Sequence, residues 1–406
     1  MPGILFLAHR VPFPPDRGDR IRSHHLLKAL ARLAPVHVGC FGEGDAEAER
    51  ALTALAASCR VAARTKPLPL AGVEAVLAGK PVSLTAFHSS KLARWVRETI
   101  AQQDIAAIVV FSGQMGQYVP DDFAGPVVID LCDVDSAKFE AYAAAGQRKW
   151  LNAREARLLA REEVRLGRRA DATILISEAE AALYRSRLTA PDKVDVRVLG
   201  NGIGAAFVDP ALVTPHPALA GMAGPHFVFT GQMDYRPNEQ AALWVIEALL
   251  PRLRARHPSA SFHVVGRNPT RALMAEDGAH GVRVWGEVPD VRPFIAAADA
   301  VLAPLLIARG VQNKVLEAMA MARPVVLTPE ASTGIAGANG EHWLISPPDP
   351  EVMASHISDL LANPAAAARI GGAARDFVLR EHGWDAMLAP LGPMLGERAE
   401  SCRHAA

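Results

Sequence analysis

Short apolar runs rich in Val and Ile alternate with longer amphipathic segments along most of this 406-residue chain. In the first half the apolar runs are residues 4–8, 36–40, 105–111, 127–131 and 172–176, and the segments with helical spacing include 18–33, 89–102 and 150–169. Such an alternation is typical of a parallel sheet covered by helices. The chain is therefore expected to be an α/β protein.

The alternation restarts after an aperiodic stretch rich in Pro and Gly, residues 207–225, which predicts a linker. Beyond it the strand-like runs are 227–230, 261–265, 282–285, 300–305 and 325–328, and the segment 350–380 has helical spacing. A chain of this length has room for two domains of roughly 100–200 residues each. We expect one Rossmann-like domain over residues 1–206, a second over 226–383, and a final segment, 384–406, that is able to cross back to the first.

Two α/β domains that face each other place the carboxyl ends of their strands around one cleft, where ligands of such sheets bind. We therefore expect the functional site in that cleft. Composition limits the partners, because 43 Lys and Arg residues balance 43 Asp and Glu residues. Without a global excess of charge, nucleic acid is not an expected partner, and any anion site must be local.

The N-terminal segment, residues 1–7, has a short apolar run with no basic region before it, so it does not resemble a signal peptide. No stretch approaches the roughly 18 uninterrupted apolar residues of a membrane span. The four cysteines are widely spaced and form no paired metal or redox motif. These features favour a cytoplasmic protein with reduced thiols.

The residues with the clearest functional pattern follow an apolar run in the second half. A helical segment opens with Arg309 and Gly310 and carries Asn313, Lys314 and Glu317. Gly310 permits a tight turn, and the first amides of a helix favour an anion. A lysine there can bind phosphate oxygens, and a carboxylate can accept hydrogen bonds from two ribose hydroxyls. The pattern predicts a nucleoside diphosphate site, although a solvated Lys314–Glu317 pair would have the same spacing.

This segment resembles part of a known family. GVQNKVLEAMAMARPVV, from Gly310, resembles the donor-site segment of family 4 retaining glycosyltransferases of the GT-B fold. That segment reads as a glutamate, seven residues, then Glu-Ala-Met-Ala and Pro-Val-Val. Glu317 matches the second glutamate, which in the family holds the ribose of a nucleotide sugar. Arg309 stands where the first glutamate falls, so the resemblance implies that Arg309 helps Lys314 to neutralise the diphosphate.

Other segments follow the order of the same family across nearly the whole chain. They are FTGQMDYRPN from Phe229, FHVVGRNP from Phe262, VWGEVPDVRPFIAAADAVLAPL from Val284, RADATILISEAE from Arg169 and VLGNGI from Val198. The resemblance implies that Gly231 and Gly266 let loops approach the donor phosphates. The family often has Arg and Lys in the first of these loops, where Gln232 and Asn238 stand here. The charge that binds phosphate is therefore expected in the segment 309–314.

Two further positions come from the N-terminal half. Gly18 precedes a basic helix with Arg20 and Arg22. In the family, a glycine at this position lets the backbone approach the donor phosphates and the acceptor. For Arg20 and Arg22, exposure to solvent without a role in binding is an equally good interpretation. Asp133 follows a predicted strand and is our candidate for orienting or deprotonating the acceptor hydroxyl, with helix capping as the role of its neighbours. Asp133 and Asp135 also suggest a metal site, but no other ligand cluster is apparent and the family neutralises the diphosphate without one, so no metal is expected.

A long predicted helix, residues 150–169, has five arginines along one stripe. They are Arg154, Arg157, Arg161, Arg165 and Arg168. A basic helix of this kind can rest on anionic lipid, which would hold the protein at the inner face of the membrane if the acceptor is lipid-linked. Glu155, Glu162 and Glu163 dilute the charge, so a solvated helix is the simpler interpretation.

Together with the resemblance, these features predict a two-domain GT-B enzyme, with the acceptor domain first and the nucleotide-sugar domain second. The resemblance implies transfer of a hexose-type sugar from a nucleoside-diphosphate sugar to a glycan or lipid-linked glycan, with retention and without a cofactor. PFPPDRGDRIRSHHLLKAL and IARGVQNKVLEAMAMARPVV look most like the sugar transferases of bacterial exosortase/PEP-CTERM exopolysaccharide systems. Two alternatives stay open, a nucleotide-sugar epimerase of the same fold and a non-catalytic two-domain sugar-binding protein.

Overall fold

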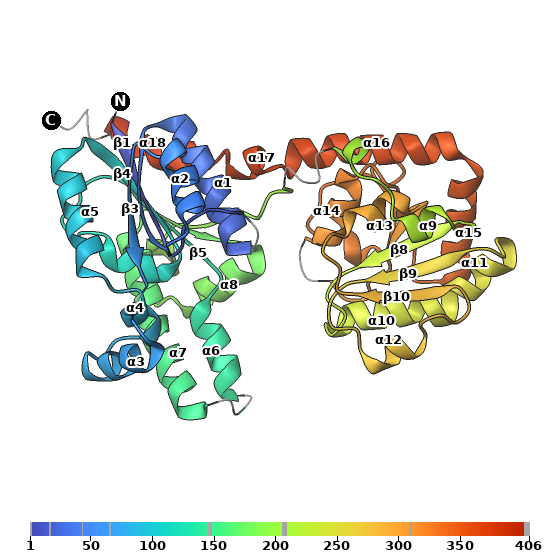
Figure 1. Ribbon diagram of the computed structural model, residues 1–406, viewed down its shortest axis with the longest axis horizontal. Coiled ribbons are helices and arrows are strands. Elements are labelled where there is room, and N and C mark those ends of the chain that lie inside the picture. Colours follow the sequence, from blue (N-terminus) through green and yellow to red (C-terminus); the bar gives the residue numbers. More distant parts are fainter. Residues whose placement is uncertain are drawn as a thin grey trace. The chain divides into compact units, whose positions relative to one another are not determined.

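The computed structural model describes residues 2–15, 18–42, 44–64, 66–144, 146, 148–204, 209–308 and 311–401. They form two compact units. The described residues up to Asn201 and from Met387 onward make the first unit, and those between Gly202 and Ala386 make the second. Each unit contains one parallel sheet with helices packed on it (Figure 1). The predicted fold class, two parallel-sheet α/β domains, is confirmed.

The first unit has a seven-stranded parallel sheet in the order β3-β2-β1-β4-β5-β6-β7. Its strands are β1 (Gly3–Ala8), β2 (Val36–Gly42), β3 (Ser58–Ala63), β4 (Ile105–Phe111), β5 (Val127–Cys132), β6 (Ala172–Leu175) and β7 (Val196–Val198). Its helices are α1 (Gly18–Leu33), α2 (Ala46–Leu55), α3 (Leu68–Leu77), α4 (Val82–Ala86), α5 (Ser90–Gln102), η1 (Gly113–Tyr118), α6 (Asp135–Ala144), α7 (Lys149–Arg169), α8 (Glu178–Arg187), η2 (Pro191–Lys193) and α18 (Leu391–Ser401). Every residue of the central strand β1 is buried, as expected for a strand covered on both faces.

The second unit has a six-stranded parallel sheet in the order β10-β9-β8-β11-β12-β13. Its strands are β8 (His226–Thr230), β9 (Ser261–Val265), β10 (Val282–Gly286), β11 (Ala300–Ala303), β12 (Val325–Leu327) and β13 (Leu344–Ile345). Its helices are η4 (Pro210–Leu212), α9 (Pro217–Ala220), α10 (Arg236–Trp244), η5 (Val245–Leu249), α11 (Leu250–Arg256), α12 (Arg271–Ala275), α13 (Arg292–Ala297), α14 (Asn313–Ala320), η6 (Glu330–Ser332), α15 (Pro350–Ala362) and α16 (Pro364–Glu381), and α17 (Trp384–Leu388) follows.

The stretch predicted as a linker contains two short helices, η4 and α9. Leu219 of α9 is fully buried in the hydrophobic core of the second unit. Leu219 is the one buried residue of 209–225, and the rest of this stretch is exposed or half-buried. Within the described residues, no helix has the length and apolarity needed to cross a membrane.

A buried ion pair ties three segments of the first unit together. Arg22 of α1 and Asp130 of β5 are both almost fully buried, and Nε of Arg22 donates to Oδ2 of Asp130 at 2.7 Å. The same guanidinium donates to the carbonyl oxygens of Leu199 at 2.9 Å and Gly200 at 3.2 Å, and to Oδ1 of Asn201 at 3.0 Å. Removing one partner of such a pair costs about 3–5 kcal/mol, because it leaves an unpaired buried charge. Arg22 is therefore structural.

Candidate functional site

The strand order of the second unit reverses between β8 and β11. Strands β9 and β10 lie on one side of β8, whereas β12 and β13 lie on the far side of β11. At such a switch point the connections leave the sheet in opposite directions, and ligands of open parallel sheets bind outside the carboxyl ends of the two strands. The loop that begins at Gly231 follows β8, and α14 is the first helix after β11. Both therefore belong to the switch point.

Two glycines allow the loops at this end of the sheet to lie close together. Gly231 has φ of 154° and Gly266 has φ of 153°, a region that favours glycine. A Cβ at Gly266 would lie 1.6 Å from the carbonyl oxygen of Gly231, so no side chain fits there. A Cβ at Gly231 would lie 2.9 Å from Nδ2 of Asn238 and 3.1 Å from Nζ of Lys314. The bare backbone of the β8 loop thus packs directly against Lys314.

Lys314 lies in the first turn of α14, and only 8% of its surface is exposed. Its Nζ donates a 2.5 Å hydrogen bond to Oδ1 of Asn238 on α10 and lies 4.2 Å from the ring centroid of Phe229. Burial lowers the pKa of Lys314 to about 7, and the nearby Glu317 carboxylate opposes that shift. Because burial disfavours the charged ammonium group, a bound anion would raise this pKa and restore the charge.

Glu317 lies one turn further along α14, and its side chain is partly buried. Burial raises the pKa of Glu317 to about 7, and the cation of Lys314 opposes that shift. Among the described residues the carboxylate of Glu317 has no hydrogen-bond partner and no ion pair within 4.0 Å. A solvated Lys314–Glu317 surface pair does not describe this arrangement, since Lys314 is buried and its partner is Asn238.

The other predicted residues of this unit lie at or near the start of α14. Asn313 is its first residue and is exposed. Arg309 and Gly310 lie outside the described residues. Arg236, the first residue of α10, is also exposed.

The sequence pattern did not indicate how Asn238 is used. Its Nδ2 donates to the carbonyl oxygen of Gln232 at 2.9 Å, which directs its Oδ1 toward Lys314. Gln232 in turn accepts a 2.7 Å hydrogen bond from Nη2 of Arg267, in the loop after β9. The one indication in the sequence was that Asn238 stands where family 4 glycosyltransferases often have Arg or Lys. An amide oxygen is neutral, so this partner holds the lysine without cancelling its charge.

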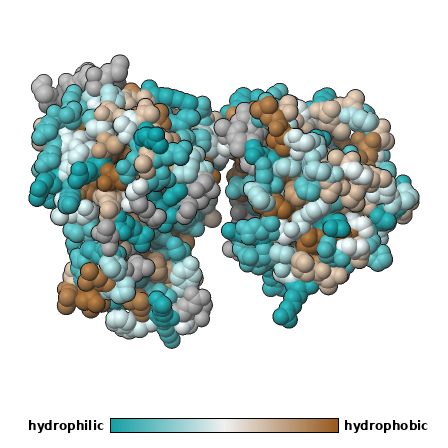
Figure 2. Space-filling view, in the orientation of Figure 1, coloured by the Kyte–Doolittle hydropathy of each residue, from teal (hydrophilic) through white to brown (hydrophobic). Residues whose placement is uncertain are grey.

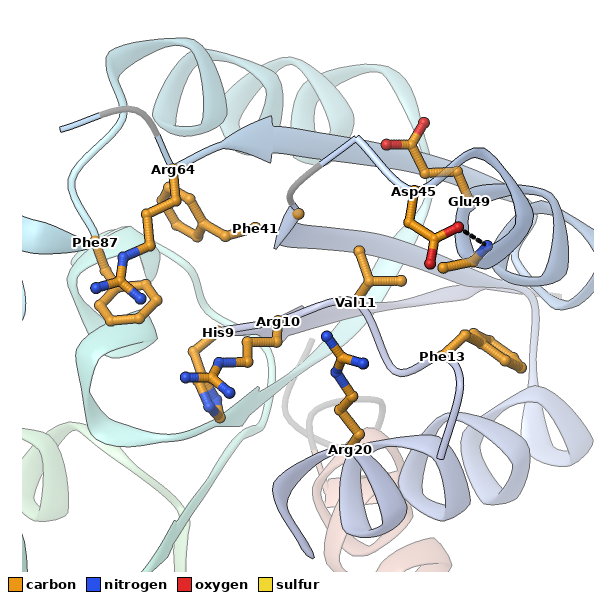
Figure 3. Close-up of a pocket in the computed structure, with 12 residues that line it drawn as sticks. His9, Arg10, Val11, Phe13, Arg20, Phe41, Asp45, Glu49, Arg64 and Phe87 are labelled. Atoms are coloured by element: carbon orange, nitrogen blue, oxygen red, sulfur yellow. Dashed lines mark hydrogen bonds between the residues drawn. The ribbon is translucent and has the colours of Figure 1, made fainter. Parts of the chain in front are cut away.

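The first unit has its own switch point, between β1 and β4. A hollow of about 200 Å³ lies beside the end of β1 and is lined by His9, Arg10, Val11, Phe13, Arg20, Phe41, Gly42, Asp45, Ala48, Glu49, Arg64 and Phe87. Figure 3 shows the basic side chains gathered around it, with the guanidinium of Arg64 beside the ring of Phe87 at 4.9 Å from the centroid. Such a lining suits a polar ligand with negative charge.

Gly18 is the first residue of α1, and Asp19 follows it at the edge of this hollow. Oδ2 of Asp19 lies 3.3 Å from Nε2 of His9 and 3.2 Å from Nη1 of Arg10. The hydrogen bond with His9, together with the charge of Arg10, lowers the pKa of Asp19 to about 2. Asp19 therefore stays ionised and fixes two of the basic groups that follow β1.

Asp133 directly follows β5, as the sequence predicted, and is exposed. Partial burial of its carboxyl group raises its pKa, and the neighbouring carboxylates Glu180 and Asp135 add to the shift. A carboxylate with a raised pKa is a better base. In the described part of the chain, no group of three or more His, Cys, Asp or Glu residues is placed to hold a metal ion.

Glutamates from neighbouring helices bind the amides at the start of α6. The amide of Val134 donates to Glu180 of α8 at 2.7 Å, and the amide of Ser136 donates to Glu163 of α7 at 2.8 Å. The acceptors of these two amides therefore come from α8 and α7 and not from residues of the segment itself, where the sequence predicts the cap. This leaves the carboxylate of Asp133 for other partners.

Comparisons with known proteins bear on this site. Residues 224–363 match the family model described as "Glycosyl transferases group 1", and this range contains β8 to β13, both glycines and α14. The curated relatives found include the glycogen synthase of Mycobacterium tuberculosis, which is 26% identical over 214 residues. That alignment covers 49% of this chain and 48% of the glycogen synthase, so the chain spans about half the length of the curated relatives it matches.

Solved structures resemble the chain over nearly its whole length. Sucrose-phosphate synthase of Thermosynechococcus elongatus has a TM-score of 0.57 at 18% identity, with 100% of both chains covered. HepE of Anabaena, solved in complex with UDP-glucose, has a TM-score of 0.55 at 15% identity, with 98% of this chain and 100% of that chain covered. At these identities the likeness is one of fold. The two α/β units have the GT-B fold.

Proposed function

We propose that this protein is a retaining glycosyltransferase that moves a sugar from a nucleoside-diphosphate sugar to a hydroxyl acceptor. The observation that carries the proposal is the buried Lys314, held by Asn238 beside Glu317 in the region that matches the group 1 family model. The pair supplies a desolvated cation for a diphosphate and a carboxylate for the ribose hydroxyls. The complexes of HepE with UDP and UDP-glucose support a nucleotide sugar as the donor.

In this reaction the bond from the anomeric carbon to the diphosphate oxygen breaks, and a bond to the acceptor oxygen forms on the same face. Negative charge grows on the departing diphosphate, and a fixed cation lowers the barrier there. Lys314 has this role in our proposal, together with Arg309 and the helix terminus after Gly310. Gly231 and Gly266 bring their loops to the phosphates, with Gly18 and Asn313 as further donor contacts.

The first unit carries the acceptor in this proposal. Asp133 orients the acceptor hydroxyl or accepts its proton, a role that suits its raised pKa. The acceptor is a glycan or a lipid-linked glycan, and the reaction belongs to the assembly of exopolysaccharide or another surface glycan at the cytoplasmic side of the membrane. The resemblance of the segments around Gly18 and Glu317 to exosortase-associated sugar transferases supports this assignment.

Turnover with and without an acceptor tests the proposal. The purified protein is incubated with a panel of nucleoside-diphosphate hexoses, either alone or with glycan and lipid-linked acceptors, and the release of nucleoside diphosphate is measured. We expect release that depends on an acceptor, and a product whose anomeric configuration, read by NMR, matches that of the donor. Conversion of a donor to its epimer without an acceptor would identify an epimerase, and absence of turnover with every pair would contradict transfer.

A further inference from the structure

Helix α3 presents an apolar surface to solvent. Leu70, Val73 and Val76 are each more than half exposed, and Leu77 is 84% exposed. We call these four residues the α3 face. Figure 2 shows the brown patch that they form over α3, at the lower left of the view. Four exposed large apolar side chains on one ten-residue helix indicate a surface that binds a membrane or another protein.

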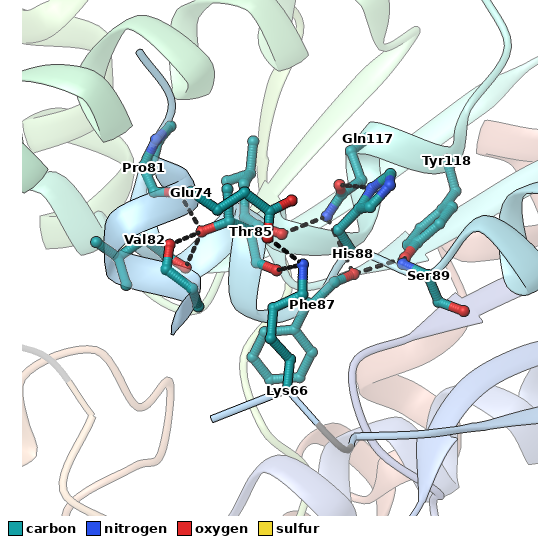
Figure 4. Close-up of polar contacts among 12 residues, drawn as sticks. Lys66, Glu74, Pro81, Val82, Thr85, Phe87, His88, Ser89, Gln117 and Tyr118 are labelled. Carbon is teal, nitrogen blue, oxygen red and sulfur yellow. Dashed lines mark hydrogen bonds and ion pairs between the residues drawn. The ribbon is translucent and has the colours of Figure 1, made fainter. Parts of the chain in front are cut away.

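The opposite side of α3 is firmly packed, so the α3 face is not a poorly folded core. Ala71 and Ala75 are fully buried, and Oγ1 of Thr85 on α4 donates to the carbonyl oxygen of Ala71 at 2.9 Å. Figure 4 shows the contacts around Thr85 and those of Gln117 on η1, whose Nε2 donates to the carbonyl oxygens of Leu84 at 3.0 Å and Phe87 at 3.2 Å. The platform formed by α3 and α4 is thus fixed to the body of the first unit.

Two consecutive residues of α7 hold the platform from the other side. Arg154 donates to the carbonyl oxygens of Ala75 at 2.7 Å and Lys80 at 3.2 Å, at the C-terminal end of α3. Glu155, which is 3% exposed, accepts hydrogen bonds from the amides of Val82 and Ser83 at the N-terminal end of α4. A cation at a helix C-terminus and a carboxylate at an N-terminus are both favourable. Helix α7 is therefore fixed against the C-terminal end of α3 and the start of α4.

The stripe of α7 that contains Arg154 continues the surface with cations and one aromatic ring. Trp150 is one turn before Arg154 and is 71% exposed. Arg157 and Arg161 are exposed as well, and neither makes an ion pair or hydrogen bond with a described residue. Tryptophan and basic side chains beside aliphatic ones are the composition of surfaces that lie in a lipid headgroup region.

The carboxylates of these helices are already engaged, so they leave the cations uncompensated. On α3 and α7 they are Glu74 with Lys66, Glu155 with α4, Glu162 with Arg165 and Glu163 with Ser136, and on α6 they are Asp135 with Lys138 and Glu140 with Arg187. Figure 4 shows Lys66 reaching Glu74, at 2.5 Å. Glu155, Glu162 and Glu163 therefore do not shield Arg157 and Arg161.

We propose that the α3 face and the cations of α7 dock the protein on an anionic lipid surface, with the four apolar side chains in the headgroup region. Charge complementarity decides between a lipid surface and a neutral partner. The unpaired cations lie on the stripe of Arg154, which contacts the C-terminal end of α3, and anionic lipid attracts them while the acyl boundary accepts the apolar side chains. The proposal stands on this surface alone and does not depend on the proposed transfer reaction.

Vesicle co-sedimentation tests the proposal with a matched pair of variants. Leu77 is 84% exposed on the α3 face, and Leu212 is 83% exposed on η4, so Leu77→Asp and Leu212→Asp make the same change at equal exposure. Wild type and both variants are mixed with vesicles of phosphatidylcholine, alone or with phosphatidylglycerol. We expect wild type to bind the anionic vesicles and Leu212→Asp to bind them as wild type does. Leu77→Asp should bind them at least roughly tenfold more weakly.

The charge is tested in the same assay. Arg157→Glu with Arg161→Glu should weaken binding to anionic vesicles and remove its dependence on salt, whereas the melting temperature stays unchanged because both side chains are exposed. Failure of wild type to bind anionic vesicles would overturn the proposal, as would equal binding by Leu77→Asp and wild type. A concentration-dependent dimer that Leu77→Asp dissociates, in the absence of vesicle binding, would assign the α3 face to a second copy of the chain instead.

Discussion

The ammonium group of Lys314 donates a 2.5 Å hydrogen bond to Oδ1 of Asn238, and both side chains are buried. This partner is an amide oxygen, which orients the lysine but carries no full negative charge. A carboxylate in the same place would have formed a neutral pair and lowered the attraction for a phosphate. The positive charge of Lys314 is therefore not neutralised by its partner. It lies at the switch point of the second sheet, where ligands of such sheets bind.

Nucleotide affinity should be greatest near pH 7. Burial lowers the pKa of Lys314 to about 7 and raises the pKa of Glu317 to about 7. As pH rises above 7 the unliganded protein loses the proton of Lys314, so binding a diphosphate must take up a proton and the affinity falls, by up to about tenfold per pH unit. As pH falls below 7, Glu317 gains a proton and loses its capacity to accept two hydrogen bonds.

Dissociation constants of nucleoside diphosphates measured by calorimetry from pH 5.5 to pH 9 check this profile. Lys314→Met should remove the alkaline limb and Glu317→Gln the acid limb. The two groups titrate as a pair, so each variant is expected to shift the remaining limb slightly. A profile that is flat above pH 7 in wild type would show that Lys314 is not the cation that binds the phosphates.

Replacing Gly266 with alanine should destabilise the second unit. The new Cβ would lie 1.6 Å from the carbonyl oxygen of Gly231, so the loop must move, at a cost on the order of 1–3 kcal/mol or more. Gly372, inside α16, is a matched control because a Cβ there meets nothing within 4 Å. Gly372→Ala should raise stability by about 0.5–1 kcal/mol. Thermal melting of both variants decides the matter, and equal melting temperatures would contradict the close approach.

Asp133→Asn should slow transfer without weakening nucleotide binding. The amide cannot take a proton from the acceptor hydroxyl, so the rate at saturating donor should fall by roughly a hundredfold. Asp122→Asn, at an exposed aspartate of the same unit, is the control and should behave as wild type. A loss of nucleotide affinity equal to the loss of rate would mean that Asp133 acts through the fold and not on the acceptor.

Transfer should persist in the presence of EDTA. The proposed neutralisation of the diphosphate uses the side chain of Lys314, Arg309 and helix amides, none of which a chelator removes. The rate of nucleoside diphosphate release with and without EDTA provides the measurement. Loss of activity that manganese or magnesium restores would instead indicate a metal site at Asp133 and Asp135.

The interior strands and the edge strand β10 were predictable from the sequence, and the other three edge strands were not. Strands β4 and β9 have the predicted bounds, because a strand buried on both faces is a continuous apolar run. The three strands that the pattern missed, β3, β7 and β13, all lie at sheet edges. An edge strand is partly exposed, and β13 has only two residues, so neither hydrophobicity nor length distinguishes it from a loop.

The local pattern also predicted a helix that carries Asn313, Lys314 and Glu317, but not what holds these side chains. Lys314 and Asn238 are 76 residues apart, and Arg22 and Asp130 are 108 residues apart. Neither contact follows from spacing along the chain, because each depends on how separate βα units pack. The same limit applied to α7, where Glu155 looked like a surface charge and is in fact bound to the first amides of α4.

Binding of nucleoside diphosphates to two variants of α14 tests the central claim most directly. Wild type, Lys314→Met, Glu317→Gln and the exposed control Lys193→Met are titrated with ribonucleoside diphosphates and their 2′-deoxy analogues in a calorimeter. We predict that wild type and Lys193→Met bind equally and that Lys314→Met binds at least about tenfold more weakly, a difference of 1.36 kcal/mol or more. Melting temperatures serve as the control on folding. Lys314→Met should not lower the melting temperature, since the substitution removes a desolvated charge.

The 2′-deoxy analogues separate the two roles within that measurement. If Glu317 holds the ribose, Glu317→Gln should weaken binding of the ribonucleotides more than that of their 2′-deoxy analogues, whereas Lys314→Met should weaken both equally. Wild-type affinity in both variants, with folding intact, would contradict a nucleotide site at Lys314 and Glu317 and with it the proposed transfer reaction.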